Sequence, residues 1–228
     1  DLDTLPKTTK SFDARQHFMT IGNFRHAPNW DAVLYLQSLW PLIRKKLPQA
    51  ELHIYGSYPP PKATALHSPK MGFLIKGWAE NAYTVMENAR VCLAPLRFGA
   101  GLKGKLLDAM VMQTPSVTTP IGAEGMKVPD IPWPGGIAYD AEGFVDAAVH
   151  LYCDKQAWEA AQSHTSTHLQ HQFNGQMLAK QLIDKVSKVQ QNLTEHRLNN
   201  FTGAMLKHHT MTSTKYMSQW IMEKNKST

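Results

Sequence analysis

The sequence predicts an α/β fold in which an open, mostly parallel sheet carries helices on both faces. Three observations support this prediction: short apolar runs alternate with stretches of helical periodicity, glycine or proline ends most of the apolar runs, and 43% of the 228 residues are hydrophobic. Such alternation is typical of βαβ units with parallel strands, and this hydrophobic content is sufficient for a buried core. Ligands bind such sheets outside the carboxyl ends of the strands, where the strand order reverses.

The first half of the chain alternates strands and helices in this way. The expected strands are residues 17–21, 51–55 and 73–76, and the expected helices are residues 29–47 and 81–88. Asn29 is a suitable cap for the first helix, and Pro48 ends it. Pro41 lies inside this helix and marks a point where the helix kinks or splits.

The second half repeats the alternation and then becomes helical. The expected strands are residues 91–94, 115–119 and 136–139, and the expected helices are residues 102–110, 142–151, 154–171 and 174–192. The first two of these strands end at Pro95 and Pro120, and Leu102, Leu106, Leu107, Ala109 and Met110 recur at helical spacing.

The two ends of the chain differ from this domain, which is expected over residues 16–192. Residues 1–15 are polar and predict a tail or linker. Residues 193–228 place Phe201, Met205 and Trp220 among apolar residues at helical spacing, which predicts a C-terminal extension of two amphipathic helices. Their apolar faces need cover, either from this domain or from a missing domain or another subunit.

Charge and cysteine content limit the class of protein. The net charge of +6 suits an anionic ligand, but it is too mild to indicate nucleic acid as a partner. Cys92 and Cys153 lie in a strand-like and a helix-like apolar run, which favours buried free thiols and a reducing, cytoplasmic compartment. No apolar run approaches 18 residues, so neither a spanning helix nor a signal peptide is expected in this chain.

The stretch around residues 90–110 has the order strand, glycine turn, helix. The apolar run Val91–Ala94 is followed by the loop Phe98–Gly101 and then by a helix that carries Lys103, Lys105 and Asp108. The unpaired N–H groups of such a helix start favour an anion, and the lysines add positive charge. Asp108 shares a helix face with Lys105 and can accept hydrogen bonds from hydroxyl groups. The alternative is that the glycines only turn the chain and that Asp108 pairs with Lys105.

Glycines also follow the other predicted strands. Besides the loop at Gly99–Gly101, there are glycines at positions 22, 56, 77 and 122. Because the carboxyl ends of parallel strands lie along one edge of the sheet, we expect these loops to surround one crevice.

With these loops in place, the sequence resembles the carboxyl-terminal domain of a group 1 glycosyltransferase, a family with the GT-B architecture of two Rossmann-like domains. The resemblance spans residues 17–190 and is carried by a succession of motifs. The matching segments are Phe18–Asp31, Ala50–Gly56, Ile75–Trp78 and Ala89–Met126, the last with Gly-x-Gly-x-Lys-x-Lys, Pro-x-Val-x-Thr and Ile-Gly-Ala-Glu-Gly.

The resemblance implies a doubly wound Rossmann-like domain that holds the nucleoside diphosphate sugar, such as a UDP-sugar, as one half of the enzyme. It further implies transfer of a sugar to a hydroxyl acceptor with retention at the anomeric carbon and without a metal ion or other cofactor. A missing N-terminal acceptor domain or a partner subunit would complete the site, so the isolated chain is expected to be inactive. Contact with a membrane would arise only peripherally, through the acceptor.

The resemblance also assigns roles to residues. The loop at Gly99–Gly101 would lie against the diphosphate, Lys103 or Lys105 would neutralise it, and Arg25 would approach it, with His26 a weaker candidate. Asp108 stands where the family has the second glutamate of a pair that is seven residues apart, and Ala100 replaces the first. Lys105 and Asp108 are the implied catalytic residues. The implied donor-binding residues are Gly22, Arg25, Gly77, Trp78, Gly99, Ala100, Gly101, Leu102, Lys103, Lys105 and Asp108.

Three other functions stay open at this point. Ala100 and the absent partner domain favour a non-catalytic nucleotide-binding module. A nucleotide-sugar epimerase has the same two-domain architecture. An interaction module would use the helices of residues 193–228 to hold a partner helix or a membrane surface.

Overall fold

The computed structural model describes residues 10–207 and 209–226. The chain forms two compact units that divide between Asn174 and Gly175, and each is described by itself. The sequence placed the boundary one helix later, after residue 192. Helix α8 (Gly175–Gln191) belongs to the second unit because none of its residues is buried.

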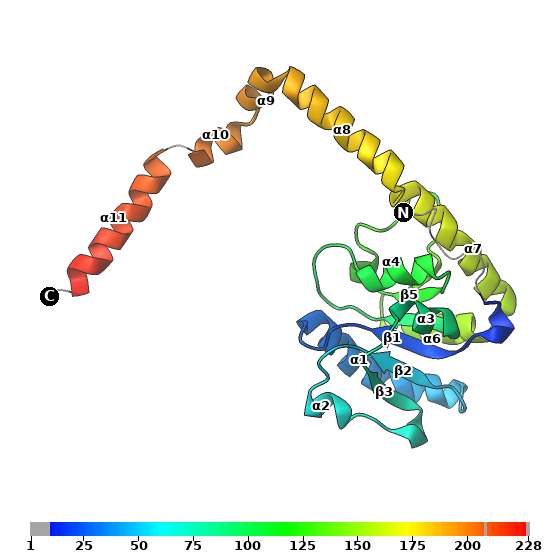
Figure 1. Cartoon of the computed structure of the whole chain (residues 1–228). Coiled ribbons are helices and arrows are strands. Elements are labelled where there is room, and N and C mark those ends of the chain that lie inside the picture. Colours follow the sequence, from blue (N-terminus) through cyan, green and yellow to red (C-terminus); the bar gives the residue numbers. More distant parts are fainter. Residues whose placement is uncertain (1–9, 208, 227–228) are drawn as a thin grey trace. The chain divides into compact units, whose positions relative to one another are not determined.

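The first unit is built on a parallel sheet whose six strands have the order β3-β2-β1-β4-β5-β6. Figure 1 labels β1, β2, β3 and β5 of this sheet. The strands are β1 (Gln16–Ile21), β2 (Leu52–Tyr55), β3 (Phe73–Gly77), β4 (Ala89–Ala94), β5 (Ser116–Thr118) and β6 (Gly135–Ile137). Phe18 of β1 lies opposite Leu52 on one side and Val91 on the other. The strand order therefore reverses between β1 and β4, and the predicted α/β fold is confirmed.

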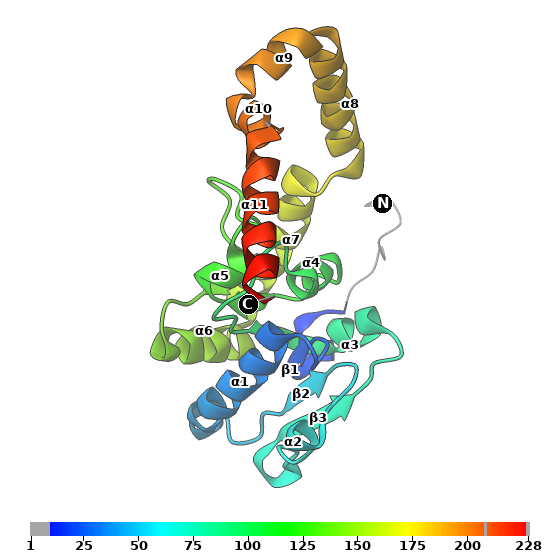
Figure 2. The ribbon, with the colours of Figure 1, turned by 90° about the vertical axis from the view of Figure 1, so that its left-hand side faces the viewer.

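Helices cover both faces of this sheet. The helices are α1 (Ala27–Lys46), α2 (Pro61–Thr64), α3 (Ala82–Asn88), α4 (Gly104–Val111), α5 (Pro120–Ala123), α6 (Ala141–Cys153) and α7 (Lys155–Gln172), with short 3-10 helices at Phe12–Ala14 (η2) and Pro69–Met71 (η3). Helices α1 and α6 pack together on one side, whereas α4 contacts both α3 and α7 on the other (Figure 2).

The core is divided between the two faces because successive side chains of a strand point in opposite directions. Phe18 and Val91 belong to the larger apolar cluster, which they form with residues of α1 and α6. Met19 and Cys92, the next residues along each strand, pack instead against residues of α3 and α4. The sheet is thus buried on both sides, as the doubly wound fold requires.

The starts of two helices differ from the prediction. Helix α1 begins at Ala27 with His26 at the N-cap position, so Asn29 is not its cap. Pro28 occupies the first turn, where its missing N–H costs no hydrogen bond. Helix α4 begins at Gly104, and Lys103 rather than Leu102 precedes its first turn.

Other differences concern shorter features. Helix α1 continues through Pro41, which lies on its exposed face where water can satisfy the freed carbonyl group. Helices α2 and α5 were not predicted, because four residues are too few to show helical periodicity. Residue 136 was expected to begin the last strand, but β6 begins at Gly135 and ends at Ile137.

The polar tail expected over residues 1–15 ends earlier than predicted. Residues 1–9 lie outside the described residues, and η2 follows. Phe12 is buried and packs edge-on against Trp158, with the ring centroids 5.7 Å apart. Arg15 is fully buried and donates hydrogen bonds into the core. Residues 10–15, which precede β1, are therefore part of the folded domain.

The cysteines differ from each other in burial. Cys92 is buried in the sheet and Cys153 is exposed at the end of α6, and neither forms a disulfide. The prediction of two buried thiols is thus correct only for Cys92, because Cys153 lies on the outer side of its helix. Burial raises the pKa of the Cys92 thiol to about 12. Within residues 10–207 and 209–226, no helix is long and apolar enough to cross a membrane.

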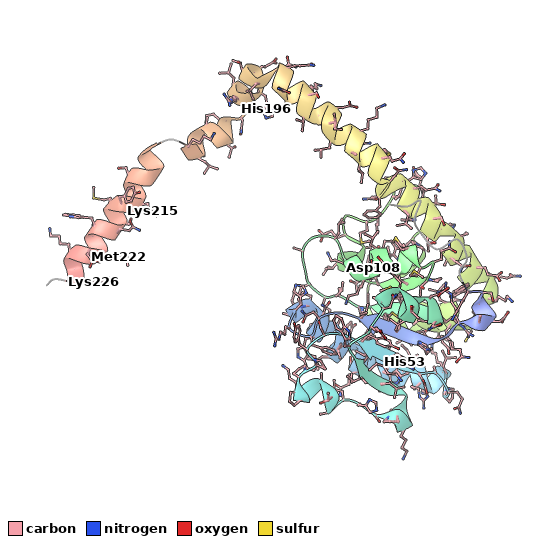
Figure 3. All side chains as sticks on the ribbon, viewed as in Figure 1. His53, Asp108, His196, Lys215, Met222 and Lys226 are labelled. Atoms are coloured by element: carbon pink, nitrogen blue, oxygen red, sulfur yellow. The ribbon has the colours of Figure 1, made fainter. Side chains whose placement is uncertain are left out.

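The second unit contains α8 and, after residue 192, three further helices among the described residues, where two were expected. These are α9 (Leu193–Asn199), α10 (Phe201–Lys207) and α11 (His209–Lys226). No residue of α8, α9 or α10 is buried. In Figure 3, α11 is the helix that carries the labels Lys215, Met222 and Lys226. Residues 175–228 carry eight basic and three acidic side chains, so this unit holds +5 of the net charge of +6.

Two histidines stack on each other at the start of the sheet. The rings of His17 and His53 lie 3.8 Å apart at an interplanar angle of 15°, and His53 is labelled on β2 in Figure 3. Burial is the main cause that lowers the pKa of His17 to about 4, and it also lowers that of His53. Both rings are therefore neutral in the folded protein at neutral pH.

Acidification is expected to destabilise the first unit through this pair. The folded pKa of His17 lies below the value of about 6.5 in an unfolded chain, so the unfolded state binds more protons between these two values. Stability should decrease as the pH falls from about 6.5 towards 4, by roughly 2–3 kcal/mol from His17 alone. Urea unfolding at pH 7 and at pH 5 measures the loss.

The control for this prediction is His17→Asn. Asparagine tolerates the positive φ of 47° at this position and does not titrate. The variant should lose less stability than the unsubstituted protein over the same pH interval. An equal loss in both proteins would show that other groups cause the acid sensitivity.

Candidate functional site

A pocket of about 330 Å³ lies at the carboxyl edge of the sheet, between β1 and β4. This is the point where the strand order reverses, which is the usual ligand position in an open parallel sheet. The residues that line it come from the end of β1, the start of α1, the start of α3, the loop after β4 and the first turns of α4. They are Ile21, Gly22, His26, Pro28, Asn29, Ala82, Leu96, Phe98, Gly99, Ala100, Leu102, Lys103, Gly104, Lys105 and Asp108.

The backbone comes close to the pocket at two glycines. A Cβ atom on Gly22 would lie 2.6 Å from Cγ of Asn29, so the β1 exit can approach α1 only without a side chain. Gly99 has a φ of 138°, which L side chains rarely adopt. Both positions therefore leave the main chain accessible to a ligand.

Lys105 brings a positive charge into the pocket. Its Nζ donates a hydrogen bond to Oδ1 of Asn29 at 2.8 Å, while Nδ2 of Asn29 donates to the carbonyl of Asn23 at 3.1 Å. Burial lowers the pKa of Lys105 to about 8. The amide of Asn29 thus fixes the position of the ammonium group, a role that sequence reasoning missed when it treated Asn29 as a helix cap.

Lys103 has a different role from Lys105. It is buried at the N-cap position of α4, and its Nζ donates to the carbonyl of Gly101 at 2.6 Å. This bond braces the glycine loop from within. Lys105 is therefore the lysine whose ammonium group is held beside α1 and the pocket, whereas the ammonium group of Lys103 is committed to the loop.

Asp108 lies one turn further along α4 and also lines the pocket; Figure 3 labels it. Burial raises the pKa of its carboxyl group. Within the described ranges, the side chain of Asp108 forms no ion pair or hydrogen bond, so the alternative in which it pairs with Lys105 is not what the structure has. Its carboxylate is available to accept hydrogen bonds from a ligand.

Four of the residues assigned to the donor site do not line this pocket. Arg25 lies over the ring of Tyr58 instead, with Cζ 3.9 Å from the ring centroid, and its backbone N–H donates to Oδ1 of Asn23. Gly77 ends β3, where its carbonyl accepts a hydrogen bond from Gly56. Trp78 is 74% exposed. The carbonyl of Gly101 serves Lys103, as described above.

Arg97, which follows β4, is already paired. Its Nε donates to Oδ2 of Asp31 at 2.9 Å, and its guanidinium lies over the ring of Tyr35. It faces a neighbouring pocket of about 370 Å³ that also contains Leu96. Arg97 therefore adds no free charge to the pocket of Lys105 and Asp108.

A family model described as glycosyl transferases group 1 matches residues 15–154, which is more than half of the chain. A comparison with curated protein sequences gave no match.

The fold is similar to those of solved glycosyltransferases. TarM from S. aureus, in a complex that contains UDP, is 15% identical with a TM-score of 0.65 over 81% of this chain and 37% of TarM. Pneumococcal GtfA, an O-GlcNAc transferase in complex with UDP and GlcNAc, gives 15% identity, a TM-score of 0.62 and coverages of 81% and 38%. This chain thus spans well under half the length of either protein.

A shorter structure matches over nearly its whole length. The C-terminal domain of a group 1 family glycosyl transferase, LpcC from Francisella tularensis, is 12% identical with a TM-score of 0.58 over 77% of this chain and 98% of that domain. At these identities the similarity concerns the fold.

Proposed function

The chain belongs to the group 1 glycosyltransferase family, and from this premise we propose that residues 10–174 form the donor-binding half of a sugar-transferring enzyme. The observation that carries the proposal is the pocket at the strand-order reversal, which combines Lys105 and Asp108 on one helix with the glycine loop before it. The ligand would be a nucleoside diphosphate sugar. TarM and GtfA, whose structures contain UDP, make a uridine nucleotide the first one to test.

The proposed reaction transfers the sugar from the donor diphosphate to a hydroxyl group of an acceptor, with retention at the anomeric carbon. As the glycosidic bond to the diphosphate breaks, negative charge grows on the leaving group. Lys105 supplies an opposing charge, and the first turn of α4 supplies N–H groups that have no intrahelical acceptors. These groups would do the work of a divalent cation, so the proposed mechanism is metal-independent.

Asp108 would bind the ribose of the donor. Its carboxylate can accept hydrogen bonds from two neighbouring hydroxyl groups, and burial makes each of them stronger than it would be in water. Ala100 also lines the pocket and offers no carboxylate to the sugar. We therefore assign the handling of the sugar to the backbone of the glycine loop and to the part of the enzyme that lies outside this chain.

A second part of the enzyme would provide the acceptor site. The chain spans 37% of TarM and 38% of GtfA, whereas it covers 98% of an isolated C-terminal domain. Either an N-terminal domain or a partner subunit would provide this acceptor site. The exposed apolar side chains of α8, such as Leu182 and Ile183, support the presence of a partner for the second unit.

Calorimetric titration of the full chain with UDP, GDP and ADP tests the donor site. We expect one of the three diphosphates to bind at least tenfold more tightly than the others, with equal affinity in the presence and absence of magnesium. Asp108→Asn should weaken binding of that nucleotide about fivefold to tenfold, the value of one or two charge-assisted hydrogen bonds, and leave binding of pyrophosphate unchanged. Failure of all three nucleotides to bind at millimolar concentration would contradict the proposal.

A further inference from the structure

Another pocket lies on the outer side of the α1 start, where the loops after β1 and β2 meet. It encloses about 600 Å³ and is lined by Phe24, Arg25, Trp30, Tyr58 and Lys62 together with nearby alanine and proline residues. The N–H of Phe24 donates to the carbonyl of Ser57 at 3.1 Å, which ties the two loops together. None of the residues that line it lines the donor pocket.

Two cations in this pocket are held on aromatic rings. Cζ of Arg25 lies 3.9 Å from the ring centroid of Tyr58, and Nζ of Lys62 lies 4.8 Å from that of Trp30. No Asp or Glu lines the pocket, and neither cation has an acidic partner among residues 10–207 and 209–226. Their positive charges are thus uncompensated by any carboxylate.

The stacking prepares these cations to bind an anion. The guanidinium of Arg25, whose Cζ lies over the ring of Tyr58, carries five N–H donors in a fixed fork that matches a phosphate in a bidentate contact. The ring also restricts the side chain, so less entropy is lost on binding. Tyr58 itself has a φ of 57°, a conformation that is rare for a bulky residue and often marks a functional position.

We propose that this pocket is a second anion site, separate from the donor pocket, that takes the phosphate group of a phosphorylated sugar. Arg25 and Lys62 contact the phosphate, while Tyr58 and Trp30 position them. The phosphate could instead belong to the nucleotide donor if Arg25 turned across the α1 start toward His26 and the donor pocket. The experiment separates these two sources.

The test is titration of the full chain with glucose 6-phosphate, with glucose as the neutral control, both without UDP and with UDP in excess. We expect glucose 6-phosphate to bind with a dissociation constant in the millimolar range and glucose not to bind. Excess UDP should leave the affinity unchanged. The titration without UDP measures binding of glucose 6-phosphate alone, so its result does not depend on whether the donor pocket binds UDP.

Variants assign the site to these residues. Lys62→Gln and Arg25→Gln should each weaken glucose 6-phosphate binding about fivefold or more, the value of one lost contact between a cation and a phosphate. The matched control is Lys70→Gln, since Lys70 is exposed on η3 and lines none of the pockets described here; its affinity should not change. Absence of binding, competition by UDP, or an effect of Arg25→Gln on UDP alone would each overturn the proposal.

Discussion

Replacement of Lys105 by alanine is expected to weaken binding of the preferred nucleoside diphosphate by about 30-fold to 100-fold. Lys105 lines the pocket between β1 and β4, and Asn29 of α1 accepts a hydrogen bond from its ammonium group. A charge-assisted contact with a phosphate in a partly buried site is worth roughly 2–3 kcal/mol, which corresponds to this loss of affinity. Calorimetric titration of both proteins measures the effect.

The same lysine should make binding depend on pH. Because its pKa is lowered to about 8, the amine is charged at pH 7 and loses its charge as the pH rises through that value. Affinity for the diphosphate should therefore decrease between pH 7 and pH 9. In Lys105→Arg the decrease should be smaller, because a guanidinium stays charged over this range.

A surface lysine provides the control for Lys105→Ala. Lys45 is exposed in the last turn of α1, and its replacement by alanine should leave the affinity unchanged. If Lys105→Ala bound the nucleotide within twofold of the unsubstituted protein, the diphosphate would not lie at the start of α4.

The second large effect concerns stability: Arg15→Met should lower the free energy of unfolding by about 3–5 kcal/mol. Arg15 has no exposed surface, and its guanidinium serves several acceptors at once. Its hydrogen bonds go to the carbonyl oxygens of Lys10, Met86, Ala89 and Met112 and to Oγ1 of Thr114. Methionine would remove all of these hydrogen bonds together with the buried charge, while Oγ1 of Thr114 would still donate to the Met86 and Met112 carbonyls. Such loss of one partner in a buried network costs several kcal/mol.

Urea unfolding followed by tryptophan fluorescence measures this loss, since Arg15 also lies over the ring of Trp158. Burial lowers the pKa of Arg15 to about 10, so the residue stays charged at neutral pH. Arg15→Lys should lose less stability than Arg15→Met because it keeps the charge and some of the donors. Lys45→Met should change stability by less than about 0.5 kcal/mol, as expected of a surface substitution. A loss below 1 kcal/mol for Arg15→Met would contradict the inference that the hydrogen bonds of Arg15 stabilise the domain.

The burial of Arg15 is a feature of the fold that could not be predicted from the sequence. The sheet could be predicted because its strands are short apolar runs. The residues that mark each run are neighbours in the sequence, so these signals are local. The burial of Arg15 depends on carbonyl groups at the ends of α3 and α4, far away in the sequence. A polar segment therefore predicted a tail, although Phe12 and Arg15 of that segment are buried in the core.

In the candidate site, too, some features could be predicted from the local sequence and others depend on residues far away in the chain. Lys105 and Asp108 could be predicted because their spacing on one helix follows directly from the sequence. The position of Arg25 could not, since it depends on the ring of Tyr58 from another loop. The contribution of Asn29 was hidden for a similar reason, because its partner Lys105 lies in a distant βα unit.

The pairing of β1 with β4 has a consequence for how the pocket comes into existence. One wall is formed by residues 21–29 and the other by residues 96–108, and only the parallel pairing of Phe18 with Val91 brings them together. This pairing encloses the whole of β2, β3 and their connections, a long loop whose closure is slow compared with local helix formation. The pocket is therefore absent until the centre of the sheet has assembled. A ligand that binds there stabilises the entire domain against unfolding, by about 2.7 kcal/mol at one hundred times its dissociation constant.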